Sequence, residues 1–337
     1  MKKILILFAV FASCSSCSEC ALIKQTKPAL GTIVEITVAD KDKSHELLYG
    51  AIEKAFSEIE RIEGLFSRFR PESDISRINN YSSLKPIKVS PETIEVLEDS
   101  IKFSRLTDGA FDITICPLME DWDFKRRKIK SLPQDAQLKE SLDKVGWQNI
   151  NIIKEKRVVS FGQPQMSLDL GGIAKGYAVD KAVEVLKQEG IDNALVNAGG
   201  DIYALGKCSK VNKWHIGLQH PRKRDAILTV LELENKAVAT SGDYQKYIEI
   251  NKTRYSHILN PESGWPASKN AISVTILADN CTSADALATS VFALGPEKGM
   301  SLVNRLENTE AIMAGFEEDK LCFWLSEGLR ERVRLNQ

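Results

Sequence analysis

The chain has no excess of either charge. Its 45 lysines and arginines balance 46 aspartates and glutamates, which leaves a formal net charge of -1 over 337 residues. Proteins that attract nucleic acid through their overall field carry a clear basic excess. The composition therefore gives no support for a nucleic-acid partner, and we expect none. With 43% hydrophobic and 27% charged residues, the composition is that of an ordinary globular protein.

Closely spaced cysteine pairs are missing from the body of the chain. Three of the seven cysteines cluster within the first twenty residues, and the others are widely separated: Cys116, Cys208, Cys281 and Cys322. A structural zinc site needs close pairs of cysteine or histidine ligands. The spacing therefore gives no support for zinc, although a disulfide stays open in an oxidising compartment.

Three familiar catalytic signatures are also absent. The sequence contains no G-x-G-x-x-G fingerprint, no G-x-x-x-x-G-K-[ST] phosphate loop and no G-x-S-x-G nucleophile elbow. Neither a standard nucleotide site nor serine-hydrolase chemistry is therefore supported.

The N-terminal apolar run, Ile4 to Ala12, is too short to cross a bilayer. Lys2-Lys3 precede it, which is the pattern of a secretory signal. The run ends in a motif that resembles a bacterial lipoprotein processing site, Phe11-Ala12-Ser13-Cys14. We therefore expect residues 1–20 to be a signal peptide and acylation region with Cys14 lipidated.

Two alternatives to acylation at Cys14 remain open. Cys17 could be the acylated residue, or the chain could be secreted after cleavage near Cys20. In either case residues 21–28 are expected to be a tether between the anchor and the fold.

The most informative stretch runs from Ser167 to Asp201. It predicts an extended segment, a turn at Gly171-Gly172, a helix from about Ala174 to Gln188, a short strand over 194–196 and a second turn at Gly199-Gly200. A glycine turn that leads into a helix exposes N–H groups and the positive end of the helix dipole, which favour phosphates.

Charged residues flank both glycine turns of this stretch. Asp169 lies just before the first turn, Asp201 just after the second, and Lys175 adds a cation. A ligand site and a plain tight connection both fit this pattern, and the residues alone leave the two open.

The rest of the chain mixes helices with strands. Helices are expected over about 44–66, 90–107, 133–144, 282–294 and 297–306. Strands are expected over 33–38, 150–161 as a hairpin, 214–218, 227–233, 237–240, 244–250, 255–259, 271–277, 311–314 and 322–325. Residues 67–89 are expected to be loop, 108–124 a glycine turn with a short strand, and 125–130 (KRRKIK) a solvated loop. These elements predict an α+β (mixed α/β) fold with a largely antiparallel sheet flanked by helices.

Two oxygen-bearing side chains share one face of the helix expected over 282–294. Asp285 and Thr289 are four residues apart, and such donors suit Mg²⁺. The residues alone favour a purely structural role, with Thr289 bonded back to the helix and Asp285 serving its first turn.

His257 lies at a predicted strand end beside the turn of residues 260–264. A neutral imidazole there could act as a general base. A structural histidine fits the pattern equally well.

Taken together, these stretches resemble the ApbE family of FAD:protein FMN transferases. The resemblance covers Ala29 to about Leu325, and six motifs carry it in order. They are Leu30-Gly31-Thr32, SRFRPESDISRIN (67–79), DGAFDITICPL (108–118), LDLGGIAKGYAVD (168–180), NAGGDIYALG (197–206), and SGDYQKY (241–247) followed by YSHILNPESGWPA (255–267) and SADALATSVFALG (283–295).

The resemblance implies a single flavin-transferase domain over residues 29–337. It implies that FAD is the donor substrate, that Mg²⁺ is the cofactor, and that FMN moves to a threonine (or serine) hydroxyl of a client flavoprotein while AMP leaves. It also implies that the clients are subunits of membrane redox complexes, and that the enzyme is lipid-anchored to the bacterial inner membrane facing the periplasm. An FAD pyrophosphatase and a non-catalytic FAD-binding lipoprotein are the alternatives.

The resemblance also assigns residues. The metal site falls on Asp285, Thr289 and the main-chain carbonyl of Gly172, and His257 corresponds to a histidine near the acceptor hydroxyl. The FAD contacts fall on Leu30, Phe69, Ala110, Phe111, Asp112, Asp169, Lys175 and Ile258.

The chain departs from the family pattern at three positions. Many members have methionine at Leu30 and tyrosine or tryptophan at Phe69, which keeps the apolar or aromatic character. Some have aspartate where this chain has Ala288, which leaves fewer oxygen donors for a metal.

Overall fold

A computed structural model describes residues 22–40, 42–124, 131–209, 212–223, 225–251, 253–267, 271–318 and 320–336. The expected signal peptide with Cys14, Cys17 and Cys20, and the basic run 125–130, lie outside the described residues.

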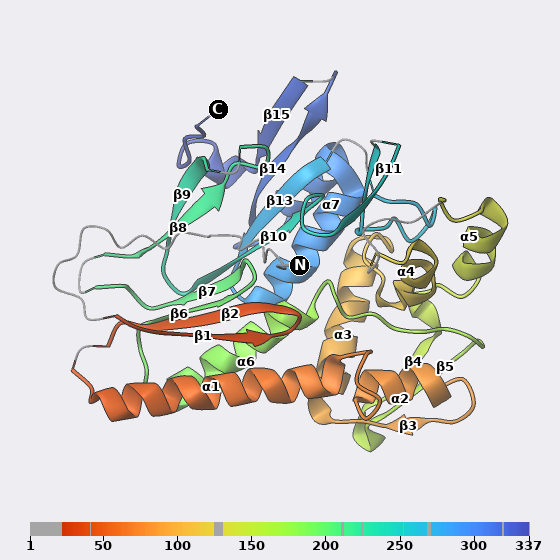
Figure 1. The fold of residues 1–337 in the computed structure, drawn as a ribbon, viewed down its shortest axis with the longest axis horizontal. Coiled ribbons are helices and arrows are strands. Elements are labelled where there is room, and N and C mark those ends of the chain that lie inside the picture. The colour runs from red at the N-terminus through yellow and green to blue at the C-terminus, as the bar shows by residue number, and fades with distance from the viewer. Residues whose placement is uncertain are drawn as a thin grey trace, which may run out of the picture.

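An eight-stranded antiparallel sheet forms the centre of the molecule (Figure 1). Its strands follow the order β1-β2-β6-β7-β10-β13-β14-β15, and every neighbouring pair is antiparallel. The bounds are β1 Ile23–Ala29, β2 Thr32–Val38, β6 Ala194–Ala198, β7 Asp201–Leu205, β10 Lys236–Gly242, β13 Ala271–Ala278, β14 Glu310–Glu317 and β15 Lys320–Leu325. The predicted α+β class with a largely antiparallel sheet is therefore confirmed.

Three long helices cover one face of this sheet. They are α1 (His45–Phe66), α6 (Ala174–Gln188) and α7 (Cys281–Val303). Figure 1 shows α1 lying along α6 beneath the β1–β2 hairpin, and α7 against β10 and β13. The main hydrophobic core lies between these helices and the sheet, with fully buried side chains such as Ile36, Ile52 and Phe292.

A separate hairpin, β8 (Trp214–Gln219) and β9 (Ile227–Leu233), covers the opposite face. Ile216, Leu231 and Trp214 from this hairpin pack with Ile202 and Val238 of the sheet in a second core. The sheet is thus buried on both faces, which explains why β7 reads as an unbroken buried run instead of an alternating one.

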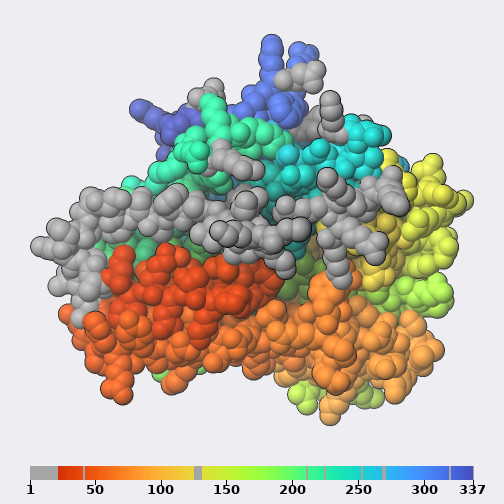
Figure 2. Space-filling model, in the orientation of Figure 1, coloured from red at the N-terminus to blue at the C-terminus, as the bar shows by residue number. Residues whose placement is uncertain are grey.

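A smaller set of elements lies beside the long helices (Figure 1), and its orange and yellow residues form the right-hand side of the face seen in Figure 2. It contains α2 (Asp74–Tyr81), α3 (Pro91–Leu106), α4 (Cys116–Trp122), α5 (Asp135–Leu142), the sheet β3-β5-β4 (Ile87–Lys88, Val158–Phe161, Ile150–Ile153) and the hairpin β11–β12 (Tyr247–Ile250, Thr253–Ser256). Short 3₁₀ turns at Ile113–Ile115, Trp147–Asn149, Lys154–Lys156 and Glu327–Leu329 complete the described elements.

The helices with clear start signals begin where predicted. The Ser44 side chain accepts the Leu47 N–H at 3.3 Å to cap α1, and the Ser90 side chain accepts the Thr93 N–H at 3.2 Å to cap α3. Pro91 occupies the first turn, where its missing N–H does no harm. The two helices predicted after residue 281 form one element, α7, interrupted at Gly295, whose φ is 77°.

Three sequence predictions are wrong. The expected tether is mostly β1, which pairs along its whole length with β2 because Ile23 and Ala29 are buried at its ends. The expected loop over 67–89 contains α2, capped by Ser73. The expected short strand over 108–124 is a 3₁₀ turn capped by Asp112 that continues into α4.

No helix within the described ranges has the length and apolar composition needed to cross a membrane.

Candidate active site

A buried charge cluster joins three distant parts of the chain. The Lys175 ammonium, in the first turn of α6, forms an ion pair with Asp201 at the start of β7. It also lies 3.3 Å and 3.4 Å from the two carboxylate oxygens of Asp285 on α7. Asp201 and Asp285 are 2% and 3% exposed, so little water screens these charges.

Close contact between α6 and α7 holds Asp285 in this position. The Gly176 N–H donates to the Asp285 carboxylate at 3.1 Å. A Cβ at Gly176 would lie 2.2 Å from the Cys281 carbonyl oxygen and 2.9 Å from the Asp285 Cβ. Only glycine therefore lets the two helices approach closely enough for this hydrogen bond.

Asp180 of α6 holds the start of α7 through hydrogen bonds. Its carboxylate accepts the N–H groups of Cys281 and Thr282, each at 2.8 Å, and the Thr282 hydroxyl at 2.6 Å. These bonds satisfy donors that a helix start otherwise leaves unpaired. They also fix the register in which Asp285 meets Lys175.

The charges within the cluster are strongly interdependent. Burial and the neighbouring Asp285 charge raise the pKa of Asp201, although Lys175 opposes them. Burial disfavours the Lys175 ammonium, but Asp201 and Asp285 outweigh it, so the net pKa of Lys175 is raised and the group stays protonated. The cluster contains two carboxylates and only one ammonium group, so it has fewer positive than acidic groups.

Thr289 lies against the first glycine turn. A Cβ on Gly172 would lie 3.2 Å from the Thr289 hydroxyl oxygen and 3.1 Å from a ring carbon of Phe111. The Ser241 hydroxyl, at the end of β10, lies 3.4 Å from the same Thr289 oxygen. Gly172 therefore packs closely against both Thr289 and Phe111.

The donors assembled here fit a hard cation. Asp285 and Thr289 occupy adjacent turns of α7, and Gly172 brings its backbone to Thr289. Across the residues that are described, no three His, Cys, Asp or Glu side chains cluster as a metal site. A cation here would therefore depend on one carboxylate together with hydroxyl and carbonyl oxygens, which suits magnesium better than zinc.

A second group of site residues is connected by Arg68, which contacts both Asp169 and Phe69. The Arg68 Nε lies 2.7 Å from the Asp169 carboxylate, and the Arg68 guanidinium stacks 4.6 Å from the Phe69 ring centroid. Asp169 also accepts the Gly171 N–H at 2.7 Å. Phe69 is 61% exposed, so its ring is a large aromatic surface accessible to a ligand.

The segment Ala110–Asp112 backs the glycine turn. The Phe111 ring is buried and contacts Phe103 edge to face. Ala110 is half-buried against the main core. The Asp112 carboxylate accepts the Thr114 N–H and hydroxyl and the Trp147 N–H, so its oxygens serve the fold. Burial, opposed by these bonds, raises the pKa of Asp112.

Leu30 occupies a strained turn between β1 and β2. Its φ is 55° and that of Gly31 is 69°, the pattern of a two-residue hairpin turn that normally selects Asn-Gly. The Gly199 N–H donates to the Ile33 carbonyl at 3.1 Å, so this turn lies beside the Gly199-Gly200 turn that precedes Asp201. A bulky residue at positive φ is rare, which makes Leu30 a candidate for a functional role.

His257 follows β12 and is partly buried. Its Nδ1 lies 2.9 Å from the Lys246 carbonyl oxygen, and because a carbonyl can only accept, Nδ1 carries the proton. The Nε2 lone pair is therefore available to accept a proton. Burial and the Lys246 charge lower the pKa of His257 to about 4, with smaller effects from Lys175 and Asp169. The next residue, Ile258, is 6% exposed.

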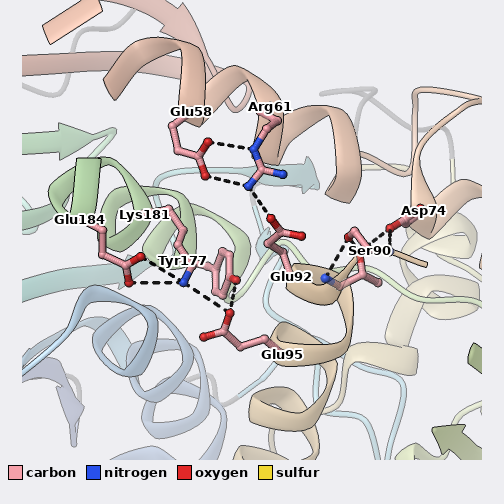
Figure 3. A network of polar contacts seen from close by, with 10 residues as sticks. Glu58, Arg61, Asp74, Ser90, Glu92, Glu95, Tyr177, Lys181 and Glu184 are labelled. Carbon is pink, nitrogen blue, oxygen red and sulfur yellow. Dashed lines mark hydrogen bonds and ion pairs between the residues drawn. The ribbon is translucent and has the colours of Figure 1, made fainter. Parts of the chain in front are cut away.

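An ionic network supports α6 from behind the site (Figure 3). The Tyr177 hydroxyl donates to Glu95 of α3, and Lys181 lies 3.4 Å from Glu95 and 3.3 Å from Glu184. Arg61 of α1 bridges Glu58 and Glu92 at 2.8 Å and 2.6 Å. The network joins α1, α3 and α6, the helix that carries Lys175.

Sequence reasoning did not assign three residues that the structure places here: Asp201, Arg68 and Ser241. Asp201 was visible as the acidic residue after the second glycine pair, and Arg68 as the neighbour of Phe69. Ser241 had no signal except its place in the SGDYQKY motif.

Comparison with known proteins identifies the class to which this site belongs. A family model described as the ApbE family matches residues 30–313. The chain belongs to the ApbE family.

Named relatives and solved structures agree with this assignment. An FAD:protein FMN transferase of Vibrio cholerae is 34% identical over 246 residues, covering 72% of this chain and 73% of that protein. One of Escherichia coli is 31% identical over 278 residues, covering 81% and 79%.

The solved structure of the flavin transferase ApbE from Vibrio cholerae has a TM-score of 0.82 at 28% identity, covering 93% of this chain and 99% of that one. An ApbE protein of Thermotoga maritima has a TM-score of 0.83 at 31% identity with the same coverage.

Proposed function

We propose that this chain moves FMN from FAD to a threonine (or serine) hydroxyl of a client flavoprotein and releases AMP, with Mg²⁺ as its metal cofactor. The observation that carries the proposal is the buried cluster of Lys175, Asp201 and Asp285 beside the contact of Thr289 with Gly172. The relatives named FAD:protein FMN transferase support flavin transfer.

Asp285, Thr289 and the Gly172 carbonyl would hold the magnesium ion. When bound, it would neutralise charge on the pyrophosphate of FAD, as metal ions do in other phosphoryl transfers. Asp201 fixes Lys175, which in turn holds Asp285 in place. Leu30, Phe69 and Phe111 would supply apolar and aromatic contacts to FAD, and the backbone of Ala110 and Ile258 would line its site.

The chemical step exchanges a phosphoanhydride bond of FAD for a phosphoester bond to the client. The client hydroxyl oxygen attacks the phosphorus on the FMN side of the pyrophosphate. The bond from that phosphorus to the bridging oxygen breaks, and the bridging oxygen leaves with AMP. The hydroxyl proton passes to Nε2 of His257, which is neutral at pH 7 because its pKa is about 4. A positioned base of this kind contributes about 10²–10⁴-fold.

A transfer assay tests the proposal directly. The chain from Leu22 onward is incubated with FAD, Mg²⁺ and a candidate client domain, and is then denatured and run on a gel. Covalent flavin fluorescence on the client, abolished by EDTA, is the expected result. Free FMN and AMP beside an unlabelled client would indicate an FAD pyrophosphatase, and intact FAD a binding protein without chemistry.

Replacing the metal-binding carboxylate should stop transfer without unfolding the protein. Asp285→Ala removes the Asp285 charge from the cluster, and we expect transfer to fall by about 10²–10³-fold, as for other lost electrostatic groups at such centres. Asp279→Ala is the matched control, because Asp279 is exposed just before α7. Wild-type rates for Asp285→Ala at limiting Mg²⁺ would show that the metal assignment is wrong.

We also propose that the enzyme is lipid-anchored to the inner membrane through Cys14, facing the periplasm, and that its clients are subunits of membrane redox complexes. Mass spectrometry of the mature N-terminus distinguishes acylation at Cys14 from acylation at Cys17 or from plain secretion.

A further inference from the structure

An open cavity lies between the β8–β9 hairpin and the outer face of the large sheet. It is a shallow depression with a volume of about 50 Å³ and is open to solvent. Its floor is aliphatic and buried, with Ile202 and Val238 from the sheet and Ile216 and Leu231 from the hairpin. Half-exposed residues form its rim: Gly199, Gly200, Leu218, Gln219, Thr240, Tyr244 and Gln245. We call this cavity the hairpin groove.

The hairpin groove lies where a sheet strand loses its neighbour. Pairing of β10 with β7 ends at Val238 opposite Ile202, whereas pairing of β10 with β13 continues to Gly242. The segment Ala239–Gly242 therefore extends beyond β7 with one edge outside the sheet ladder. At this edge the Gln245 side-chain amide donates to the Thr240 carbonyl at 2.8 Å, in the place of a backbone donor.

Two segments that line the groove lead along the chain into the candidate active site. Thr240 lines the groove, and the next residue, Ser241, lies 3.4 Å from the Thr289 hydroxyl on the other face of the sheet. Gly199 and Gly200 line the groove and lead directly to Asp201. One strand thickness thus separates the apolar groove from the charged cluster.

The wall of the groove is held in place by an ion pair. Arg222, in the connection between β8 and β9, contacts both carboxylate oxygens of Asp243 at 3.0 Å and 2.7 Å. Asp243 follows the free edge of β10 in the SGDYQKY motif. The hairpin and the β10 edge therefore form one preorganised surface, which lowers the entropy lost when a ligand binds.

We propose that the hairpin groove binds the segment of the client polypeptide that carries the acceptor hydroxyl. This inference rests on the proposed function, because a transferase whose acceptor is a protein must bind a chain as well as FAD. The client segment lies extended along the edge of β10 beyond β7, where it displaces the Gln245 side chain from the Thr240 carbonyl. Main-chain pairing there supplies affinity, and alternate side chains pack on the apolar floor of the groove. Its apolar side chains face Ile202, Ile216 and Leu231, and its hydroxyl reaches Thr289.

The first experiment identifies the peptide sequences that the hairpin groove binds. A library of displayed peptides of about ten residues, about 33 Å when extended, carries one central threonine with random flanks. It is incubated with the full-length chain, FAD and Mg²⁺, and labelled members are selected by flavin fluorescence. We expect apolar residues at every second position on one side of the threonine.

Two matched variants then test the location. Leu218→Glu places a charge on the groove rim, whereas Val230→Glu places one on the solvent face of the same hairpin, where Val230 is 51% exposed and pairs with Gly217 beside Leu218. The KM for the selected peptide should rise about tenfold or more in Leu218→Glu, since an apolar contact is lost. The KM should not change in Val230→Glu, and the Kd for FAD and kcat at saturating peptide should be unchanged in both.

Each other outcome overturns the inference in a recognisable way. Equal KM values in the two variants would mean that the client binds elsewhere. A weakened Kd for FAD in Leu218→Glu would mean that the groove holds the flavin. Labelling of a folded client domain but of no library peptide would overturn binding of an extended segment while leaving the proposed transferase intact. Wild-type protein that labels neither would overturn the proposed function itself.

Discussion

His257 carries a pH dependence that distinguishes it from an ordinary histidine. A general base must be unprotonated, and burial with the Lys246 charge lowers its pKa to about 4. Because the imidazole stays neutral well below its usual pKa of about 6.5, kcat should stay flat from about pH 8 down to about pH 5 and fall only below that.

The measurement is kcat against pH at saturating FAD and acceptor, with circular dichroism as a control for acid unfolding. Lys246→Gln should move the acid limb to higher pH, because one positive neighbour of the imidazole is gone. A limb with its midpoint near pH 6.5 in the wild type would contradict a partly buried His257 that stays neutral.

At the scale of secondary structure, we predict that the β1–β2 turn gives up stability for a contact between Leu30 and FAD. Leu30 has a φ of 55°, a region that disfavours most L-residues by about 1–2 kcal/mol. Leu30→Asn should raise the free energy of unfolding by about 1 kcal/mol, because Asn-Gly suits such a turn. The same change should weaken FAD binding, since an apolar contact is lost.

Urea denaturation and titration of FAD fluorescence measure the two effects separately. A variant that is both less stable and unchanged in its affinity for FAD would show that the turn is neither strained nor part of the flavin site.

The α6–α7 contact gives a second prediction at this scale. Gly176→Ala places a methyl group 2.2 Å from the Cys281 carbonyl oxygen, so the helices must separate. We expect the free energy of unfolding to fall by about 1–3 kcal/mol, as for other overpacked sites. Transfer activity should fall as well, because Asp285 moves away from Lys175.

Gly50→Ala is the matched control in urea denaturation. Gly50 is exposed in α1, and nothing lies within 4 Å of an added Cβ. It should therefore gain about 0.5–1 kcal/mol from helix propensity alone. A loss of stability at Gly50 equal to that at Gly176 would show that steric contact between helices is not the cause.

At the scale of the whole molecule, β1 belongs to the folded domain. A chain beginning at Leu30 lacks the strand that pairs with β2, and it leaves β2 as an unprotected edge. It should lose at least about 2 kcal/mol of stability, because buried Ile23 is removed, and it should aggregate more readily.

A chain beginning at Leu22 keeps β1 and serves as the comparison. Equal thermal unfolding midpoints for the two chains would mean that β1 does not contribute to the stability of the domain.

Local signals explain which elements could be predicted. The helix Ala174–Gln188 matches its prediction, and α1 and α3 begin at predicted serine caps, because capping and helical periodicity depend on residues close in sequence. The helix α2 was missed because DISRINNY is short and mostly polar, and the segment is held by Asp74, which accepts the Ser90 N–H at 2.7 Å. The strand β1 was missed because Pro28 and Lys27 suggest a linker, yet an edge strand tolerates both.

The sequence by itself determined the mixed helix and strand content, the glycine turns, and the motifs that indicate the ApbE family. Only the tertiary structure decided that Asp201 joins Lys175 and Asp285, that the oxygens of Asp112 serve the fold, that Nδ1 of His257 carries its proton, and that β10 extends past β7 beside an apolar groove. Turns, caps and periodicity are set by neighbouring residues. The charge state of a buried carboxylate and the shape of a groove depend on residues that approach one another only when the sheet and helices have packed.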